Sequence, residues 1–175
     1  MAYCASVTDA AFVHLRGIHT LDMTGCGQDT ITDAAFAHLA GIQRLSMWGC
    51  WQATITDAAF AHLRDIQLLN MSQCYQLTDT AFVHLRGIHT LYMRGCNQLA
   101  ITDAASVHLR GIHTLMMDGC HQATITGANF MCLQGLRFMR MTYCRNEQLA
   151  VARSHGLPVA RGVLFLCLRQ LDEED

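Results

Sequence analysis

Six cysteines recur along the chain at a nearly constant spacing of 24, 24, 22, 24 and 24 residues: Cys26, Cys50, Cys74, Cys96, Cys120 and Cys144. Five aspartates follow the same period: Asp9, Asp33, Asp57, Asp79 and Asp103. Self-similarity at a period of about 20–50 residues is typical of solenoids, in which single units are too small to bury their own apolar face and are stabilised by stacking. The chain is therefore predicted to be one stack of repeats.

The first half of each repeat, I-x-x-L-x-M-x-x-C, indicates a short strand. In residues 18–26, Leu21 and Met23 are two positions apart, so both side chains point to one face of the strand. Thr20, Asp22 and Thr24 then point to the opposite face. The same pattern predicts strands near residues 18–23, 42–47, 66–71, 88–93, 112–117 and 136–141.

The second half, I-T-D-A-A-F-x-H-L-x-G, indicates a short helix. Thr32 or Asp33 can cap the free N–H groups at its start, and this capping role is sufficient to explain the aspartate series. Gly41 falls where the end of a helix favours a left-handed residue, and Asp65 replaces glycine at the equivalent position of the next repeat. Parallel strands stack about 4.8 Å apart whereas helices pack about 8–10 Å apart, so the stack must bend with its strands on the concave side.

These residues resemble the leucine-rich repeat L-x-x-L-x-L-x-x-(N/C), and cysteine at the last place followed by I-T-D resembles the cysteine-containing subclass. The resemblance covers nearly the whole chain. It implies an α/β leucine-rich-repeat solenoid, a horseshoe segment with parallel strands on the concave face and short helices on the convex face. The subclass is best known from F-box substrate receptors. The resemblance therefore also implies a possible role as the recognition part of a ubiquitin-ligase receptor whose F-box is absent from this chain.

The repeats are predicted to occupy residues 1–145, and residues 146–175 a C-terminal capping segment of the same domain. Residues 1–4 align with residues 23–26, so the first repeat is partial and its strand edge is predicted to mediate self-association. In the capping segment, a helix is expected from Glu147 to His155, ending before Pro158. A last strand pattern follows at residues 163–168.

Composition excludes several classes of function. Apolar residues make up 51% and charged residues 15% of the chain, and the net charge is −2, which argues against a nucleic-acid partner. There is no apolar run of 18 residues and no signal peptide, so no membrane association is predicted. Most of the nine cysteines form one column and are expected to be free and buried, which predicts a reducing compartment, the cytoplasm or nucleus.

The strand residues that face away from the core differ from repeat to repeat, whereas V-H-L-R-G-I-H-T-L occurs three times in the helical part. This contrast predicts a protein-interaction module that binds another protein through the concave face. Trp, Tyr and Arg dominate interface hot spots. The predicted anchors are Trp48, Tyr92, Arg94 and Arg140, and the residues expected to complete the patch are Arg44, Asn70, Asp118 and Phe138. The alternative is a recently duplicated repeat protein with no specific partner.

Neither a metal site nor a catalytic site is predicted. Ten histidines fall mainly in two columns, one on the helices and one beside the strands, and no C-x₂-C pair or H-x₃-H spacing accompanies them. Histidines on successive helices would lie about 8–10 Å apart, too far to share an ion. No nucleophile elbow or phosphate-binding glycine loop is present. We therefore expect no enzymatic activity and no cofactor.

Overall fold

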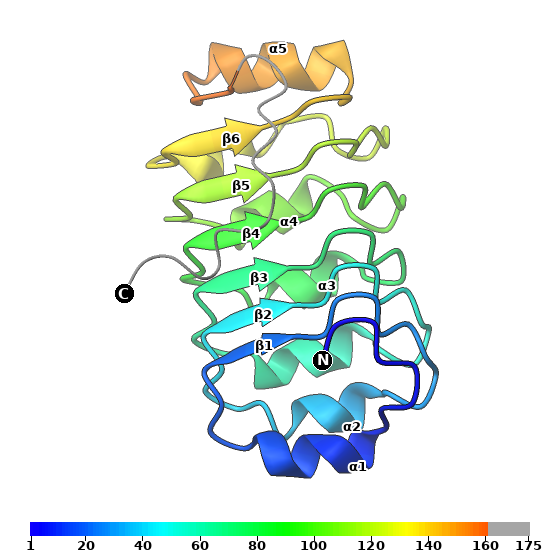
Figure 1. Cartoon of the computed structure of the whole chain (residues 1–175). Helices are drawn as coiled ribbons and strands as arrows, with labels where there is room; N and C mark the ends of the chain where they lie inside the picture. The colour runs from blue at the N-terminus through cyan, green and yellow to red at the C-terminus, as the bar shows by residue number, and fades with distance from the viewer. Residues whose placement is uncertain (161–175) are drawn as a thin grey trace.

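The computed structural model describes residues 1–160 and shows the predicted leucine-rich-repeat solenoid, with a sheet on one side and helical turns on the other (Figure 1). Six parallel strands form one sheet in sequence order. They are β1 (Thr20–Asp22), β2 (Arg44–Ser46), β3 (Leu68–Asn70), β4 (Thr90–Tyr92), β5 (Thr114–Met116) and β6 (Phe138–Arg140). Equivalent residues of successive repeats pair directly, as Leu21 does with Leu45, so the spacing of the sequence repeat sets the register of the sheet.

The helical segments are shorter than the predicted pattern. They are α1 (Asp9–Phe12), η1 (Val13–Leu15), α2 (Asp33–Phe36), η2 (Asp57–His62), α3 (Asp79–Phe82), α4 (Ala104–Val107), η3 (Phe130–Leu133) and α5 (Asn146–Ser154). After α2 the chain continues in tighter turns, because the N–H of Leu39 bonds to the carbonyl three residues earlier. Gly41 (φ +85°) and Asp65 (φ +74°) both adopt the left-handed conformation predicted for them.

The core is a layer of apolar side chains, most of which recur from repeat to repeat, between the sheet and the helical turns. Each repeat contributes the two strand residues, the cysteine and the apolar residues of the helical turn, so Leu45, Met47, Cys50 and Phe60 are all fully buried. Burial of these columns is the main source of stability, since no repeat could bury them alone.

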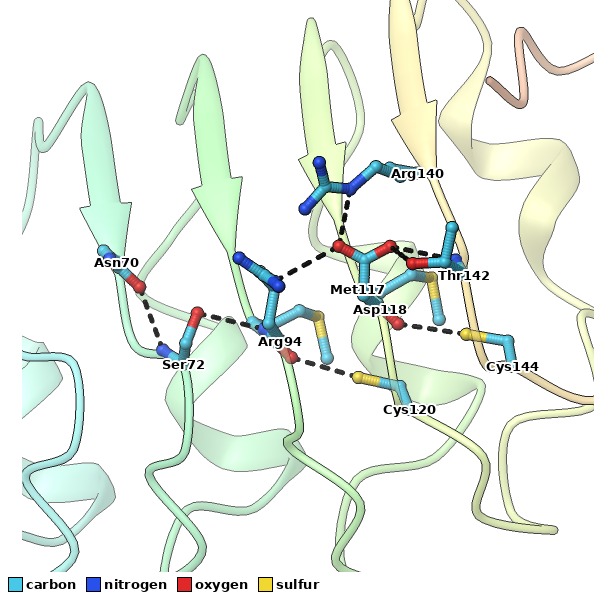
Figure 2. Close-up of polar contacts among 10 residues, drawn as sticks. Asn70, Ser72, Arg94, Met117, Asp118, Cys120, Arg140, Thr142 and Cys144 are labelled. Atoms are coloured by element: carbon cyan, nitrogen blue, oxygen red, sulfur yellow. Dashed lines mark hydrogen bonds and ion pairs between the residues drawn. The ribbon is translucent and has the colours of Figure 1, made fainter. Parts of the chain in front are cut away.

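Each cysteine of the column also links two repeats. The Cys50 thiol donates a hydrogen bond to the backbone carbonyl of Met23 (Sγ···O 3.2 Å), and Cys120 and Cys144 bond the preceding repeats in the same way (Figure 2). The eight cysteines of residues 1–160 are all free, as predicted. Burial raises the pKa of the Cys50 and Cys96 thiols to about 12, so these groups remain protonated and can act as donors.

The aspartates do not have the capping role predicted for them. Thr56 caps its own helical turn, its hydroxyl accepting from the N–H of Ala58, whereas the Asp57 carboxylate binds the next repeat. Its two oxygens accept from the backbone N–H (2.9 Å) and the hydroxyl (2.5 Å) of Thr78. The other aspartates of the series do the same with the threonine of the following repeat, Thr32, Thr56, Thr102 and Thr126. The prediction was wrong because a repeat read alone does not show which threonine the carboxylate reaches.

The sixth repeat has Gly127 where the others have this aspartate, and packing explains the change. A Cβ atom at Gly127 would lie 2.8 Å from Cγ1 of Val151 in α5, at a φ of +90°. The helix predicted from Glu147 to His155 is present as α5, one residue earlier than expected. It packs against the sixth repeat, where a further repeat would lie. The predicted strand at residues 163–168 lies outside the described residues, and the capping role of residues 146–175 stays a prediction.

At the other end of the stack, residues 1–4 lie beside β1. The amino group of Met1 donates to the carbonyl of Asp22 (2.9 Å) and the N–H of Tyr3 donates to that of Thr24 (2.6 Å). These bonds occupy part of the outer edge of β1. Self-association through this edge stays a prediction.

Replacing Asp57 by Asn should lower the free energy of unfolding by about 2 kcal/mol, because two hydrogen bonds to a charged acceptor are weakened at a partly buried site. Asp29→Asn is the matched control, since Asp29 is exposed, and it should cost less than about 0.5 kcal/mol. Urea unfolding followed by circular dichroism measures both. Equal effects of the two substitutions would show that the carboxylate links contribute nothing specific.

Brief alkylation of the native protein with iodoacetamide at pH 8 should spare the buried cysteine column. With a thiol pKa of about 12, only about one Cys50 or Cys96 side chain in ten thousand is a thiolate at this pH. Peptide mapping by mass spectrometry should therefore find label at the half-buried Cys4 and Cys132 first. Labelling of Cys96 as rapid as that of Cys132 would contradict the buried, protonated column, and unfolded protein provides the reference rate.

Candidate functional site

The concave face presents three rows of side chains, one residue per repeat in each row. Row 1 is the first residue of each strand: Thr20, Arg44, Leu68, Thr90, Thr114 and Phe138. Row 2 is the third residue of each strand: Asp22, Ser46, Asn70, Tyr92, Met116 and Arg140. Row 3 lies two residues beyond each strand: Thr24, Trp48, Ser72, Arg94, Asp118 and Thr142. All eight predicted partner-binding residues fall in these rows.

A network of charged groups is centred on Asp118 and joins residues of rows 2 and 3 (Figure 2). One carboxylate oxygen accepts a hydrogen bond from Arg140 Nε at 2.6 Å and forms an ion pair with Arg94 Nε at 3.2 Å. The other accepts from the backbone N–H (2.9 Å) and the hydroxyl (2.5 Å) of Thr142. Three consecutive strands are therefore joined by one carboxylate whose oxygens are both fully engaged.

The prediction that the partner-binding residues face solvent is wrong for three of the eight. Asn70, Asp118 and Arg140 are only 5%, 4% and 7% exposed. Asn70 turns back onto its own strand end, where its Oδ1 accepts from the N–H of Ser72 (3.1 Å). Asp118 and Arg140 are buried as an ion pair, and this pairing offsets part of the desolvation free energy of the two charged groups.

Arg94 differs from Arg140 because half of its side chain is exposed. Its Nε is bonded to Asp118, and its two terminal nitrogens have no partner among residues 1–160. Asp118 therefore fixes the direction of the guanidinium while the outer edge of the group stays available.

An open hollow of about 280 Å³ lies beside this guanidinium. Trp48, Gln73, Arg94, Asp118 and Tyr143 line it, together with Gly95 and Gly119. The lining residues come from five consecutive repeats, so the hollow crosses the strands rather than following one of them. Three of the eight predicted site residues, Trp48, Arg94 and Asp118, are brought together here.

Sequence reasoning did not find Gln73 and Tyr143, which also line the hollow. Both occupy the position after row 3, where four other repeats have glycine, and both have left-handed backbone conformations, with φ of +59° and +60°. For a residue other than glycine this conformation costs about 1 kcal/mol or more. The signal that could have found them is the replacement of a repeated glycine by a large side chain, since such strain often accompanies functional sites.

The remaining predicted residues lie away from the hollow. Tyr92 is half-buried next to the network: burial raises the pKa of its hydroxyl, and the charge of Arg140 opposes that shift. Arg44 on β2 and Phe138 on β6 belong to row 1 and are four strands apart, about 19 Å at the usual strand spacing. They cannot contact one small ligand together and would need an extended partner.

The histidine columns do not assemble a metal centre in the part of the chain that the structure describes, where no three His, Cys, Asp or Glu side chains come together. His89 and His113, beside the strands, stack with ring centroids 4.8 Å apart. On the helical side, Arg16 Nε donates to Nδ1 of His38 (3.3 Å). Within residues 1–160, no helix is both long and apolar enough to cross a membrane.

Comparison with solved structures supports the fold. The chain resembles a chain of the Rad7–Elc1 complex in yeast with a TM-score of 0.61 and 18% identity, over 77% of this chain and 39% of that one. It resembles TLR13 in its complex with the RNA ssRNA13 with a TM-score of 0.58 and 16% identity, over 72% of this chain and 18% of that one. The chain thus spans well under half the length of these structures. No family model matches the sequence, and no curated protein matches it.

Replacing Asp118 by Ala should lower the free energy of unfolding by about 3 kcal/mol, because the buried guanidinium of Arg140 loses its carboxylate. Asp22→Ala is the matched control: Asp22 is exposed and its side chain accepts one hydrogen bond, from the N–H of Thr24, so about 0.5–1 kcal/mol should be lost. Chemical denaturation gives both values. A loss at Asp118 no greater than at Asp22 would remove the network from the stabilising features of the sheet.

Proposed function

We propose that this chain is a protein-interaction module that binds a partner protein through its concave strand face. The observation that carries the proposal is the contrast between the two surfaces of the same repeats. The segment V-H-L-R-G-I-H-T-L, which runs from the helical turn to the row 1 threonine and the next strand residue, occurs three times, whereas rows 2 and 3 hold a different residue at nearly every repeat. Simple drift would change both exposed surfaces, so the difference favours selection for contacts on the concave side.

The chemistry of the concave rows suits a protein partner. Trp48, Tyr92 and Arg94 are the residue types that contribute most to protein interfaces. The guanidinium of Arg94 is already oriented by Asp118, so less side-chain entropy is lost when a partner contacts it. A nucleic-acid partner is less favoured, because the net charge is −2 and row charges are largely balanced by Asp118 and Asp22.

A more specific alternative is that the module is the recognition part of a ubiquitin-ligase receptor. Two observations favour it: the cysteine at the end of each strand pattern, and the similarity in fold to a chain crystallised in the Rad7–Elc1 complex. The buried, protonated cysteine column is also compatible with a location in a reducing compartment, the cytoplasm or nucleus. A recently duplicated repeat protein without a specific partner remains the third alternative.

Affinity capture from the source cells, read by quantitative mass spectrometry, tests the proposal. Trp48→Ala combined with Arg94→Ala should abolish capture of a partner, because both side chains line the concave hollow. The matched control combines Val83→Ala with Arg86→Ala, two exposed residues of the helical side, and should capture the partner as the wild type does. Thermal melting checks that all proteins are folded.

Loss of the partner from both variants, or from neither, would contradict binding through the concave face. Ubiquitin-ligase subunits among the proteins lost only from the concave variant would support the ligase alternative. Identical protein sets for all three chains would favour the duplicated repeat protein without a partner.

A further inference from the structure

The hollow on the concave face has the chemistry of a receptor for carboxylate groups. Within the described lining the only ionised groups are Arg94 and Asp118, and both oxygens of Asp118 are already engaged, by three hydrogen bonds and by the ion pair with Arg94. The terminal nitrogens of Arg94 have no partner among residues 1–160.

The geometry favours a carboxylate over a phosphate. Phosphate sites usually combine several cationic side chains with a group of free backbone N–H donors. Here the N–H groups of Gln73, Gly95 and Gly119 in the lining are already used, since they bond to the carbonyls of the next repeat at 2.9, 2.7 and 2.8 Å. The described lining has one cationic side chain, Arg94, and the two parallel N–H bonds at the outer edge of its guanidinium match the two oxygens of a carboxylate.

The two ends of the hollow are aromatic. Trp48 follows β2 and Tyr143 follows β6, and Arg94, which follows β4, lies midway between them. Two strand spacings separate Arg94 from each end, about 10 Å. An extended peptide covers about 3.3 Å per residue, so an apolar residue about three positions from the acidic one would reach either aromatic side chain. Tyr143 is 81% exposed and available for such a contact.

We propose that the hollow binds an acidic peptide segment of the partner protein, running across the strands, with an Asp or Glu side chain on Arg94 and apolar residues about three positions away against Trp48 and Tyr143. This inference rests on the proposed function, because it names the chemistry of the partner at the same face. The amide of Gln73, also in the lining, would bind the peptide backbone beside the acidic residue.

Selection of random dodecapeptides displayed on phage, against the immobilised full chain, tests the proposal. The enriched peptides should contain Asp or Glu with an apolar residue about three positions before or after it. A synthetic copy of an enriched peptide should then bind about tenfold more weakly when its acidic residue is changed to the amide, or when the protein carries Arg94→Gln, because one charge-assisted pair is lost. Arg86→Gln, an exposed arginine of the helical side, should leave the affinity unchanged.

A double-mutant cycle separates the contact from indirect effects. The amide peptide should bind wild type and Arg94→Gln equally, since the carboxylate and the guanidinium act as one pair. The carboxylate site would be overturned if changing the acidic residue to the amide weakened binding equally for wild type and Arg94→Gln. Enriched peptides without acidic residues would also overturn it. Tighter binding of a phosphoserine version than of the acidic peptide would also overturn it, in favour of a phosphate site.

The outcome for Trp48→Ala distinguishes this inference from the function on which it rests. Peptides without an acidic residue whose binding is lost in Trp48→Ala would overturn the carboxylate site while supporting the concave face as the binding surface. Failure to enrich any peptide that depends on Trp48 or Arg94 would count against both. Circular dichroism of each variant confirms that the fold is retained.

Discussion

The register of the parallel sheet is the constraint on which the rest of the structure depends. Because equivalent residues of successive strands pair directly, a polar side chain that recurs at one position can make the same contact with the neighbouring repeat each time. The cysteine thiol and the aspartate carboxylate both do so: the thiol donates to the carbonyl of the residue that follows the strand of the preceding repeat, and the carboxylate accepts from a threonine of the following one. Apolar burial drives the stacking, and these bonds fix the position of each repeat on the next.

A scaffold with this regularity separates stability from recognition. The side chains that hold the repeats together lie in the core and in the turns, so the concave rows are free to differ. The network at Asp118 is one exception, since it lies on the concave face and also joins three strands. Its buried charges hold Arg94 in one orientation, and a rigid cation with an aromatic side chain at some distance on either side is a more selective contact than a mobile one.

The fold could be predicted from the sequence because the repeat makes every signal appear several times. Left-handed Gly41 and Asp65, the strand positions and the buried cysteines all follow from the pattern of one repeat. The roles that depend on two repeats at once could not be predicted. The carboxylate of Asp57 lies beside its own threonine in the sequence but binds Thr78 in space.

The candidate site was predictable only in part for the same reason. Comparison of the repeats found Trp48, Arg94 and Asp118, but composition cannot show that Asp118 lies between two arginines and is withdrawn from solvent. Tyr143 was hidden because it occupies a glycine position, where the backbone conformation rather than the side chain dominates the pattern.

The links between repeats also have a direction. Side-chain donors such as the thiol of Cys50 and the hydroxyl of Thr56 belong to the later repeat, and their acceptors, the Met23 carbonyl and the Asp33 carboxylate, belong to the earlier one. If one whole repeat were deleted, each of these donors would therefore still lie opposite an acceptor of the same kind. These contacts do not depend on the number of repeats, so the length of the array can change by whole repeats while the chemistry of each junction is conserved.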